Sequence, residues 1–352
     1  MPVDRRVRRL AAACFALLPL ASTGCGLAAA IAVPLITDVI EGDNDDGGDP
    51  TILDVRNDAS STEHMVRIEI ARVDGTKPPY AYDVDEEPGR GKSLKNIFDA
   101  GPHWVRVVFA SGWRSRARAV TVVKDDTVTI TFQRVAADFA AMNGTWLGRA
   151  ETSVGAAFTY GFTVGGAGLV SARTVDGVAD AATGTLAETS EGVFRVSWSD
   201  STVAALVTDA AHVHAGLLLD SGAVGALEKG ATAPLPTGVD ADVVGSWSGT
   251  QVRFTGATLA PASLDAATAT ISAQQHWDGS DGFGYGTSGV DALSVAPGTL
   301  AYDGAAEDEL AVPLTLRLFL TADKAFGFAR LDVVTSPSFP DTSRFQLLER
   351  AP

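Results

Sequence analysis

Apolar and polar side chains alternate with a period of two over much of the chain beyond residue 50. Every second residue is apolar in 66–70, in 105–109 and in 128–132, and turn-forming residues such as Gly101-Pro102 separate these stretches. A period of two is typical of half-buried antiparallel strands. Several short strands of this kind close as two packed sheets. We therefore predict a small β-sandwich over residues 51–135.

One long connection, residues 74–103, interrupts the predicted sandwich and contains proline and glycine. We expect Tyr80 and Tyr82, which lie in it, to fold back on the sheet. The strand layout resembles the immunoglobulin-like and transthyretin-like modules of exported bacterial proteins, and this resemblance implies the same two-sheet closure.

The second half of the chain contains two copies of one pattern. Gly144-Thr-Trp146-Leu-Gly148 recurs as Gly245-Ser-Trp247-Ser-Gly249, 101 residues later. Three further landmarks follow in the same order: Asp176-Gly177 and Asp278-Gly279, Gly184-Thr-Leu186 and Gly298-Thr-Leu300, and the triplets Leu227-Glu-Lys229 and Leu348-Glu-Arg350. Landmarks rarely share one order by chance, so we interpret residues 143–230 and 244–352 as tandem domains.

Each copy contains strand-like stretches and lacks helical periodicity. Aromatic residues alternate with other residues at 158–162 and 194–198, and leucines do so at 314–320. An up-and-down barrel accommodates such strands without leaving an exposed edge. The sequence therefore predicts an all-β protein, in which a sandwich precedes two antiparallel β-barrel-like or sandwich repeats.

The Gly-x-Trp motif at the start of each copy resembles the opening of lipocalins and related calycins. In that family the tryptophan closes one end of the barrel, so the resemblance implies this position for Trp146 and Trp247. It also implies that the barrels could carry small apolar ligands. The alternative is an ordinary core tryptophan beside turn glycines.

The N-terminal segment has the order of a secretory signal peptide. Four arginines between residues 5 and 9 precede an apolar run over 10–20, and the small residues 21–24 lead to Cys25; such an order predicts export and cleavage. It resembles the signal of bacterial lipoproteins, which implies a lipid on the Cys25 thiol, although Ser22 stands where that family usually has an aliphatic residue. The same resemblance implies sorting to the outer membrane, because Gly26 and not aspartate follows the cysteine. The alternative is an uncleaved membrane anchor over residues 10–40.

Residues 25–50 are predicted to form a tether between the lipid and the first domain. The stretch 41–50 holds five acidic residues and three glycines, and such a segment repels itself and buries little apolar surface. An alternative is a calcium loop, because Asp43, Asp45 and Asp49 have the spacing of alternating ligands. We predict no cofactor other than calcium held by aspartate-rich loops.

Charge and cysteine content indicate which partners are disfavoured and where the stability of the fold comes from. The chain has 352 residues, 46% of them apolar, and a formal net charge of −16. This sign disfavours nucleic acid as a partner. The two cysteines are Cys14 and Cys25; cleavage before Cys25 would remove the first and leave no disulfide. Stability must then come from hydrophobic burial, for which the chain is long enough.

A basic stripe in the sandwich is the predicted contact surface. Arg114, Arg116 and Arg118 occupy alternate positions next to Trp113, and Arg106 lies on the preceding strand. Basic side chains with an aromatic neighbour can hold an anionic glycan or a lipid headgroup. The alternative is the solvent-exposed face of a sheet.

Two stretches that contain histidine are weak candidates for metal binding or catalysis. His212 and His214 would face the same side of a strand and could share a metal ion. The second copy has Phe326 and Phe328 at the matching positions, which favours a packing role. His276-Trp-Asp278-Gly-Ser-Asp281-Gly gathers catalytic residue types, but triad chemistry requires convergence in space. We interpret this stretch as a turn-rich loop with weak calcium affinity, in which Asp278 and Asp281 are the candidate ligands.

Together these patterns predict an exported protein, lipid-anchored at the membrane or outer membrane, with a non-catalytic binding or structural role. Its expected partners are the membrane and a glycan, lipid or envelope protein. A lipocalin-like carrier is the first alternative. A secreted hydrolase acting through the His276 stretch is the second, although the chain contains no Gly-x-Ser-x-Gly, Cys-x-x-Cys or His-Glu-x-x-His motif.

Overall fold

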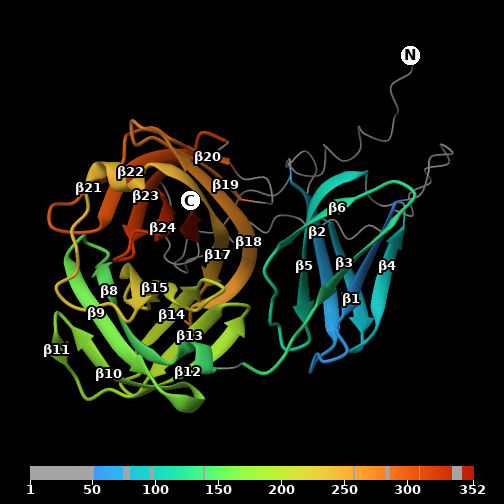
Figure 1. Ribbon diagram of the computed structural model, residues 1–352, viewed down its shortest axis with the longest axis horizontal. Coiled ribbons are helices and arrows are strands. Elements are labelled where there is room, and N and C mark those ends of the chain that lie inside the picture. The colour runs from blue at the N-terminus through green and yellow to red at the C-terminus, as the bar shows by residue number, and fades with distance from the viewer. Residues whose placement is uncertain are drawn as a thin grey trace, which may run out of the picture. The chain divides into compact units, whose positions relative to one another are not determined.

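The computed structural model describes residues 51–73, 80–95, 99–137, 139–256, 258–281, 286–308, 310–334 and 343–352 (Figure 1). The predicted signal peptide, Cys25, the tether and the candidate calcium ligands Asp43, Asp45 and Asp49 lie outside these residues. Strands dominate the described part, and its helical elements are short 3-10 turns. None of its helices has the length and apolar character needed to cross a bilayer. The protein is all-β, as predicted.

The first domain is a two-sheet sandwich. One sheet has the order β4-β1-β7 and the other the order β3-β2-β5-β6. Their bounds are β1 Ile52–Asn57, β2 Met65–Arg72, β3 Tyr80–Glu86, β4 Gly91–Lys95, β5 Gly101–Phe109, β6 Arg118–Val122 and β7 Thr127–Phe132. Apolar residues at alternate positions meet between the sheets, among them Leu53, Ile68 and Val107, each fully buried. The predicted sandwich over 51–135 is present.

The long connection of the sandwich contains two strands. The prediction of a single irregular connection over 74–103 is wrong, because β3 and β4 lie within it. Tyr80 and Tyr82 belong to β3 and pack against the core of the sandwich, as expected of them. Their spacing, continued by Val84, is itself a period of two, and it is the local signal for this strand.

Both repeats are closed eight-stranded antiparallel barrels (Figure 1). The first is β8 Gly144–Glu151, β9 Ala157–Val164, β10 Leu169–Val175, β12 Gly184–Ser190, β13 Val193–Trp198, β14 Val203–Thr208, β15 His214–Leu219 and β16 Val224–Lys229, with β11 Val178–Ala179 appended to β10. Pairing of β9 with β10 closes it. The second barrel is β17 Gly245–Thr255, β18 Ala260–Ile271, β19 Trp277–Asp281, β20 Gly286–Gly289, β22 Ala301–Asp308, β23 Pro313–Leu320, β24 Phe326–Val333 and β25 Ser343–Arg350, with β21 Ser294–Val295 appended to β22. Pairing of β20 with β22 completes it.

The two barrels match strand for strand at their ends but not at every predicted landmark. The Gly-x-Trp motif begins the first strand and the Leu-acid-base triplet ends the last strand in each. Gly184-Thr-Leu186, however, begins the fourth strand, whereas Gly298-Thr-Leu300 precedes the fifth. That predicted correspondence is wrong, because the first Gly-Thr-Leu lies within a strand and the second lies in the connection before a different strand.

Each Gly-x-Trp tryptophan seals the barrel end at which the chain enters. The indole Nε1 of Trp146 donates to the carbonyl of Met142 at 3.0 Å, and that of Trp247 donates to Val243 at 2.9 Å. These carbonyls end the 3-10 turns η2 Phe139–Met142 and η4 Asp240–Val243. The basic residue of the terminal triplet covers each ring, Lys229 at 6.0 Å and Arg350 at 5.7 Å from the ring centroid.

The second glycine of each motif is required by a close approach of neighbouring strands. A Cβ atom on Gly148 would lie 1.9 Å from the carbonyl oxygen of Ala226, and one on Gly249 would lie 1.9 Å from that of Leu347. Any side chain there would push the first strand of the barrel away from the last. In the motif Gly-x-Trp-x-Gly, the second glycine is therefore required for closure of the barrel, and the tryptophan is required for its core.

Side chains fill the interior of both barrels. In the first, Phe162 contacts Trp146 at a centroid distance of 6.5 Å and Trp198 at 6.1 Å, within one buried cluster. In the second, Trp247, Trp277 and Tyr302 pack with the alternating leucines of β23. The interior of an eight-stranded barrel is just wide enough for such filling. Both interiors are packed cores.

The two barrels also share an apolar seam. Outward-facing residues of β13 to β16 form one buried cluster with outward-facing residues of β17, β18 and β22 to β25. Strands β14 and β15 are therefore buried on both faces. Their sequences are nearly continuous apolar runs rather than alternating ones, as burial on both faces requires. We call this cluster the inter-barrel seam.

Candidate functional site

Arg106 and Arg116 of the predicted basic stripe bond to residues of the two barrels instead of facing solvent. The Nε of Arg106, on β5, donates to Glu69 at 2.5 Å, and its Nη1 bonds Asp265 of the second barrel and the carbonyl of Leu264 at 3.0 Å. The Arg106 side chain is only 11% exposed. Burial alone raises the pKa of Glu69, but the charge of Arg106 outweighs it and holds this pKa below its ordinary value. Arg106 therefore joins the sandwich to the second barrel.

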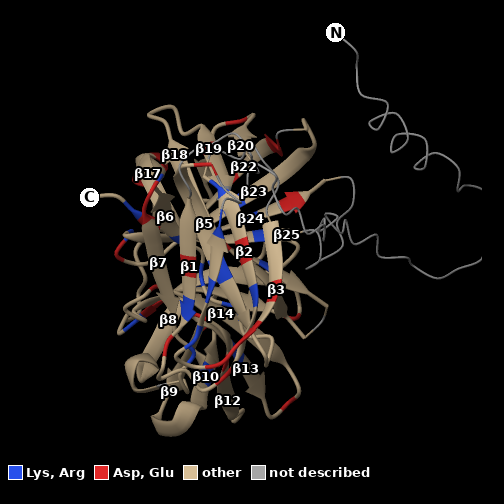
Figure 2. Ribbon diagram, turned by 90° about the vertical axis from the view of Figure 1, so that its right-hand side faces the viewer, with Lys and Arg blue, Asp and Glu red and all other residues tan. Residues whose placement is uncertain are grey.

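The other arginines of the stripe are engaged in the same way. Arg116 donates through its guanidinium to the carbonyl of Glu191 at 3.2 Å and to that of Thr208, both in the first barrel. Arg118 reaches the Glu191 carboxylate at 3.4 Å, and Arg114 lies 3.6 Å from Glu69. These contacts disfavour a free glycan-binding or headgroup-binding stripe, whereas the Arg118 side chain, 40% exposed, keeps part of the solvent exposure that the alternative predicts. Acidic and basic residues interleave along the sandwich strands in Figure 2.

The two histidines point to different neighbours. His212 has a φ of 52° in the turn before β15, so the same-face rule for strand residues does not apply to it. Its Nδ1 is hydrogen-bonded to Thr208 Oγ1 at 2.8 Å, and its ring lies edge-on to Phe194. His214 stacks on Phe326 with centroids 4.0 Å apart. These contacts favour the packing role over a shared metal ion. No set of three metal-ligating side chains occurs within the described residues.

His214 also links the two barrels electrostatically. Its Nδ1 lies 3.2 Å from Asp209 and its Nε2 lies 2.9 Å from Asp323, which belongs to the second barrel. Burial lowers the pKa of His214, but the hydrogen bonds to both carboxylates outweigh burial and raise it above the ordinary value. Burial raises the pKa of Asp209, but hydrogen bonds, the largest from His214, outweigh it and lower this pKa. Burial likewise raises the pKa of Asp323, but hydrogen bonds from Thr321, Ala325 and His214 together lower it.

This pairing predicts a pH dependence of stability. A histidine with a raised pKa stabilises the folded state fully below its unfolded pKa of about 6.5, and this contribution is lost as pH rises through the folded pKa. We expect the free energy of unfolding, from urea titrations, to fall as pH rises from about 6 to about 9. His214→Gln should flatten this fall. His276→Gln, which alters an exposed histidine, should preserve it; equal slopes in all three proteins would contradict the assignment.

The His276 stretch is a strand and not a loop. β19 spans Trp277–Asp281 and pairs with β18. Trp277 points into the barrel and donates to Thr287 Oγ1 at 3.0 Å, whereas His276 and Asp278 are exposed. The interpretation of residues 277–281 as a turn-rich loop is therefore wrong, because they form a strand in which buried and exposed positions alternate. The side chain of Asp281 lies outside the described residues.

One cavity lies where all three domains meet. It has a volume of about 350 Å³ and is lined from the sandwich by Trp113 and Arg134, from the first barrel by Glu188 and Arg195, and from the second barrel by Leu259 and Pro261. We call it the junction cavity. Of the predicted stripe residues, Trp113 alone lines it. A pocket of this size is within the range that binds small molecules.

Charged groups in the junction cavity are unevenly satisfied. Arg134 lies 3.2 Å from Glu188 and 3.5 Å from Glu63, and its guanidinium stacks on Trp113 at 4.9 Å. Burial raises the pKa of Glu188 despite this pairing. The Nε atoms of Arg134 and Arg195 are both buried without a hydrogen-bond partner among the described residues, but only Arg134 has ion-pair partners there. Arg195 was not among the predicted site residues. The feature that could have indicated it is a charged residue inside the apolar run Val193-Phe-Arg-Val196.

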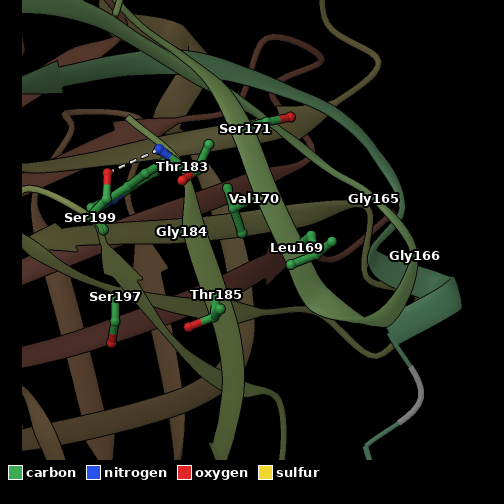
Figure 3. A pocket seen from close by; sticks show the side chains of 11 residues that line it. Gly165, Gly166, Leu169, Val170, Ser171, Thr183, Gly184, Thr185, Ser197 and Ser199 are labelled. Carbon is green, nitrogen blue, oxygen red and sulfur yellow. Dashed lines mark hydrogen bonds between the residues drawn. The ribbon is translucent and has the colours of Figure 1, made fainter. Parts of the chain in front are cut away.

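A second depression lies on the first barrel, over β10, β12 and β13 (Figure 3). It is open, with a volume of about 700 Å³. Its lining consists of glycines, hydroxyl side chains such as Thr185 and Ser197, and the apolar Leu169, Val170 and Trp198. Its lining residues carry no charged side chain, so the depression has no group that would select a ligand by charge. The junction cavity is the better-defined candidate site.

Comparison with known proteins gives little guidance. No family model matches the chain, and no curated protein is similar to it. Among solved structures, the chain is similar to a protein of unknown function of the DUF3598 family from Nostoc punctiforme PCC 73102. The two are 12% identical, the match covers 60% of this chain and 97% of that chain, and the TM-score is 0.24. A likeness of this degree assigns neither fold nor function.

Proposed function

We propose that the protein is exported and anchored to a bacterial envelope by a lipid on Cys25, and that its β-domains serve a binding role without catalysis. The observation that carries the anchoring is the order of arginines, apolar run, small residues and Cys25 at the N-terminus. The binding role is supported by the junction cavity, to which three domains contribute side chains.

The packed barrel interiors favour this proposal over a lipocalin-like carrier. A carrier needs an empty apolar interior, whereas Trp146, Phe162 and Trp198 fill the first barrel. The hydrolase alternative loses its support as well, because His276 and Asp278 are exposed and do not line either cavity described above. An envelope glycan, lipid or protein is the proposed class of partner, and the acidic net charge disfavours nucleic acid.

Replacing the predicted lipid acceptor should release the protein from the membrane. In a bacterial host fed labelled palmitate, the unmodified chain should carry the label and sediment with membranes. Cys25→Ser should carry none and move into the soluble fraction, because acyl chains supply most of the membrane affinity of such an anchor. Mass spectrometry of the N-terminus reports whether cleavage precedes residue 25.

Cys14→Ser is the matched control, because Cys14 lies in the segment predicted to be removed. It should label and sediment like the unmodified chain. An unlabelled protein that retains its first 24 residues would overturn the proposed anchoring.

A further inference from the structure

Arg195 lines the junction cavity and has no carboxylate partner among the described residues. Arg195 lies on the outer face of β13, and the residues paired with it on the neighbouring strands are Ala187 and Ala205. Neither alanine can accept a hydrogen bond from a guanidinium through its side chain. The Nε of Arg195 is buried and has no partner within the described part of the chain. A buried polar group without a partner costs free energy, so such a group is a candidate for ligand contact.

The nearby acidic group is already neutralised. Glu188, on the preceding strand, pairs with Arg134 at 3.2 Å and accepts a hydrogen bond from the Gly192 backbone at 3.3 Å. Arg134 in turn stacks on Trp113. Arg134 also lies 3.5 Å from Glu63, so it is paired with two carboxylates, whereas no carboxylate among the described residues pairs with Arg195.

The rest of the lining sets the character of the ligand body. Pro261 of the second barrel presents apolar surface beside Leu259, which is 1% exposed, and Thr189 and Thr258 supply hydroxyl groups. A planar guanidinium recognises a carboxylate through two parallel hydrogen bonds. A cavity of about 350 Å³ lies at the small end of the range for ligand pockets, so it suits a compact molecule.

We infer that the junction cavity binds a small organic monoanion whose carboxylate pairs with Arg195. The ligand body, a sugar-sized or single-ring group, lies against Pro261. The inference deepens the binding role proposed above by naming its ligand class. It is independent of the lipid anchor, because the cavity is built entirely from residues 111–261.

Calorimetric titration of the detergent-solubilised protein tests this inference. Glucuronate and benzoate serve as anionic probes, and glucose and benzyl alcohol as their neutral counterparts. We expect at least one anionic probe to bind and its neutral counterpart to bind much more weakly. Arg195→Gln should weaken that binding about 10- to 100-fold, as expected for loss of a charge-assisted hydrogen bond. Arg195→Lys should recover part of it, because it restores the charge without the bidentate geometry.

Arg90→Gln is the matched control, because it removes the same charge from an exposed position in the sandwich. It should leave binding unchanged, and thermal melting of each variant reports whether it is folded. Absence of saturation by both anions at about 10 mM, or equal affinity in folded Arg195→Gln, would overturn the inference. The lipid anchor would be unaffected, because palmitate labelling tests it separately.

Discussion

Arg106→Met should lower the free energy of unfolding of the sandwich by about 3–5 kcal/mol, the cost of removing one partner from a buried ion pair. The side chains of Glu69 and Asp265 are 8% and 5% exposed. Both carboxylates would lose Arg106 in a poorly hydrated place, and Glu69 would keep only the longer contact to Arg114 at 3.6 Å. Urea unfolding followed by tryptophan fluorescence measures the effect. Because a multidomain chain need not unfold in one step, we expect a separate, earlier transition for the sandwich.

Arg118→Met is the matched control for this prediction. The Arg118 side chain is 40% exposed and its partner Glu191 is 32% exposed. Solvent screens such a pair, so its loss should cost less than about 1 kcal/mol. In Arg106→Met with Asp265→Leu, part of the lost stability should return, because an apolar pair avoids the stranded carboxylate. Equal effects of the Arg106 and Arg118 changes would contradict a buried role for Arg106.

The contrast between these arginines shows what a strand pattern can and cannot predict. A period of two predicts that Arg106 lies on the polar face of a sheet. It does not state whether that face meets water or the charged residues of another domain. Asp265 lies 159 positions from Arg106 in the chain, and pairing over such a distance leaves no local trace. The residue type and the strand were predictable, and the partner was not.

The barrels were predictable from the sequence at positions where their geometry requires a particular residue type, such as glycine or tryptophan. Gly148 allows two strands to approach closely, and Trp146 closes one end of the barrel. Both recur in the second copy, as Gly249 and Trp247. Gly-Thr-Leu carries less information, since turns as well as strands tolerate glycine and threonine. For that reason it occurs within a strand in the first copy and before a different strand in the second, and its alignment failed.

The inter-barrel seam had a sequence signal that alternation alone does not capture. Residues 203–207 and 215–219 are nearly continuous apolar runs, which indicate strands buried on both faces. A lone barrel would expose one face of each strand, so these runs predict a covering partner. The identity of the partner, the second copy of the same fold, required the structure.

Phe328→Ala should destabilise the inter-barrel seam by about 3–5 kcal/mol, the usual cost of removing a buried phenylalanine ring. Phe328 is fully buried in the seam and stacks on Phe345 at a centroid distance of 5.9 Å. Across the seam it faces Gly216 of β15, where an added Cβ would lie 2.0 Å from the Phe328 ring. Gly216→Ala should therefore also destabilise, by about 1–3 kcal/mol, because it overpacks a closed interface.

The double variant Gly216→Ala, Phe328→Ala decides whether these two residues act through the seam. The new methyl group would occupy part of the space that the ring leaves, so the combined cost should be smaller than the sum by about 0.5–3 kcal/mol. Calorimetric unfolding of the four proteins gives this coupling. Gly286→Ala is the control, since a Cβ there meets no atom within 4 Å, and it should add independently to Phe328→Ala. Strict additivity for Gly216 as well would mean that the barrels do not pack through this face. A clear coupling would mean that the second copy completes the core of the first, so that neither barrel is expected to be fully stable without its twin.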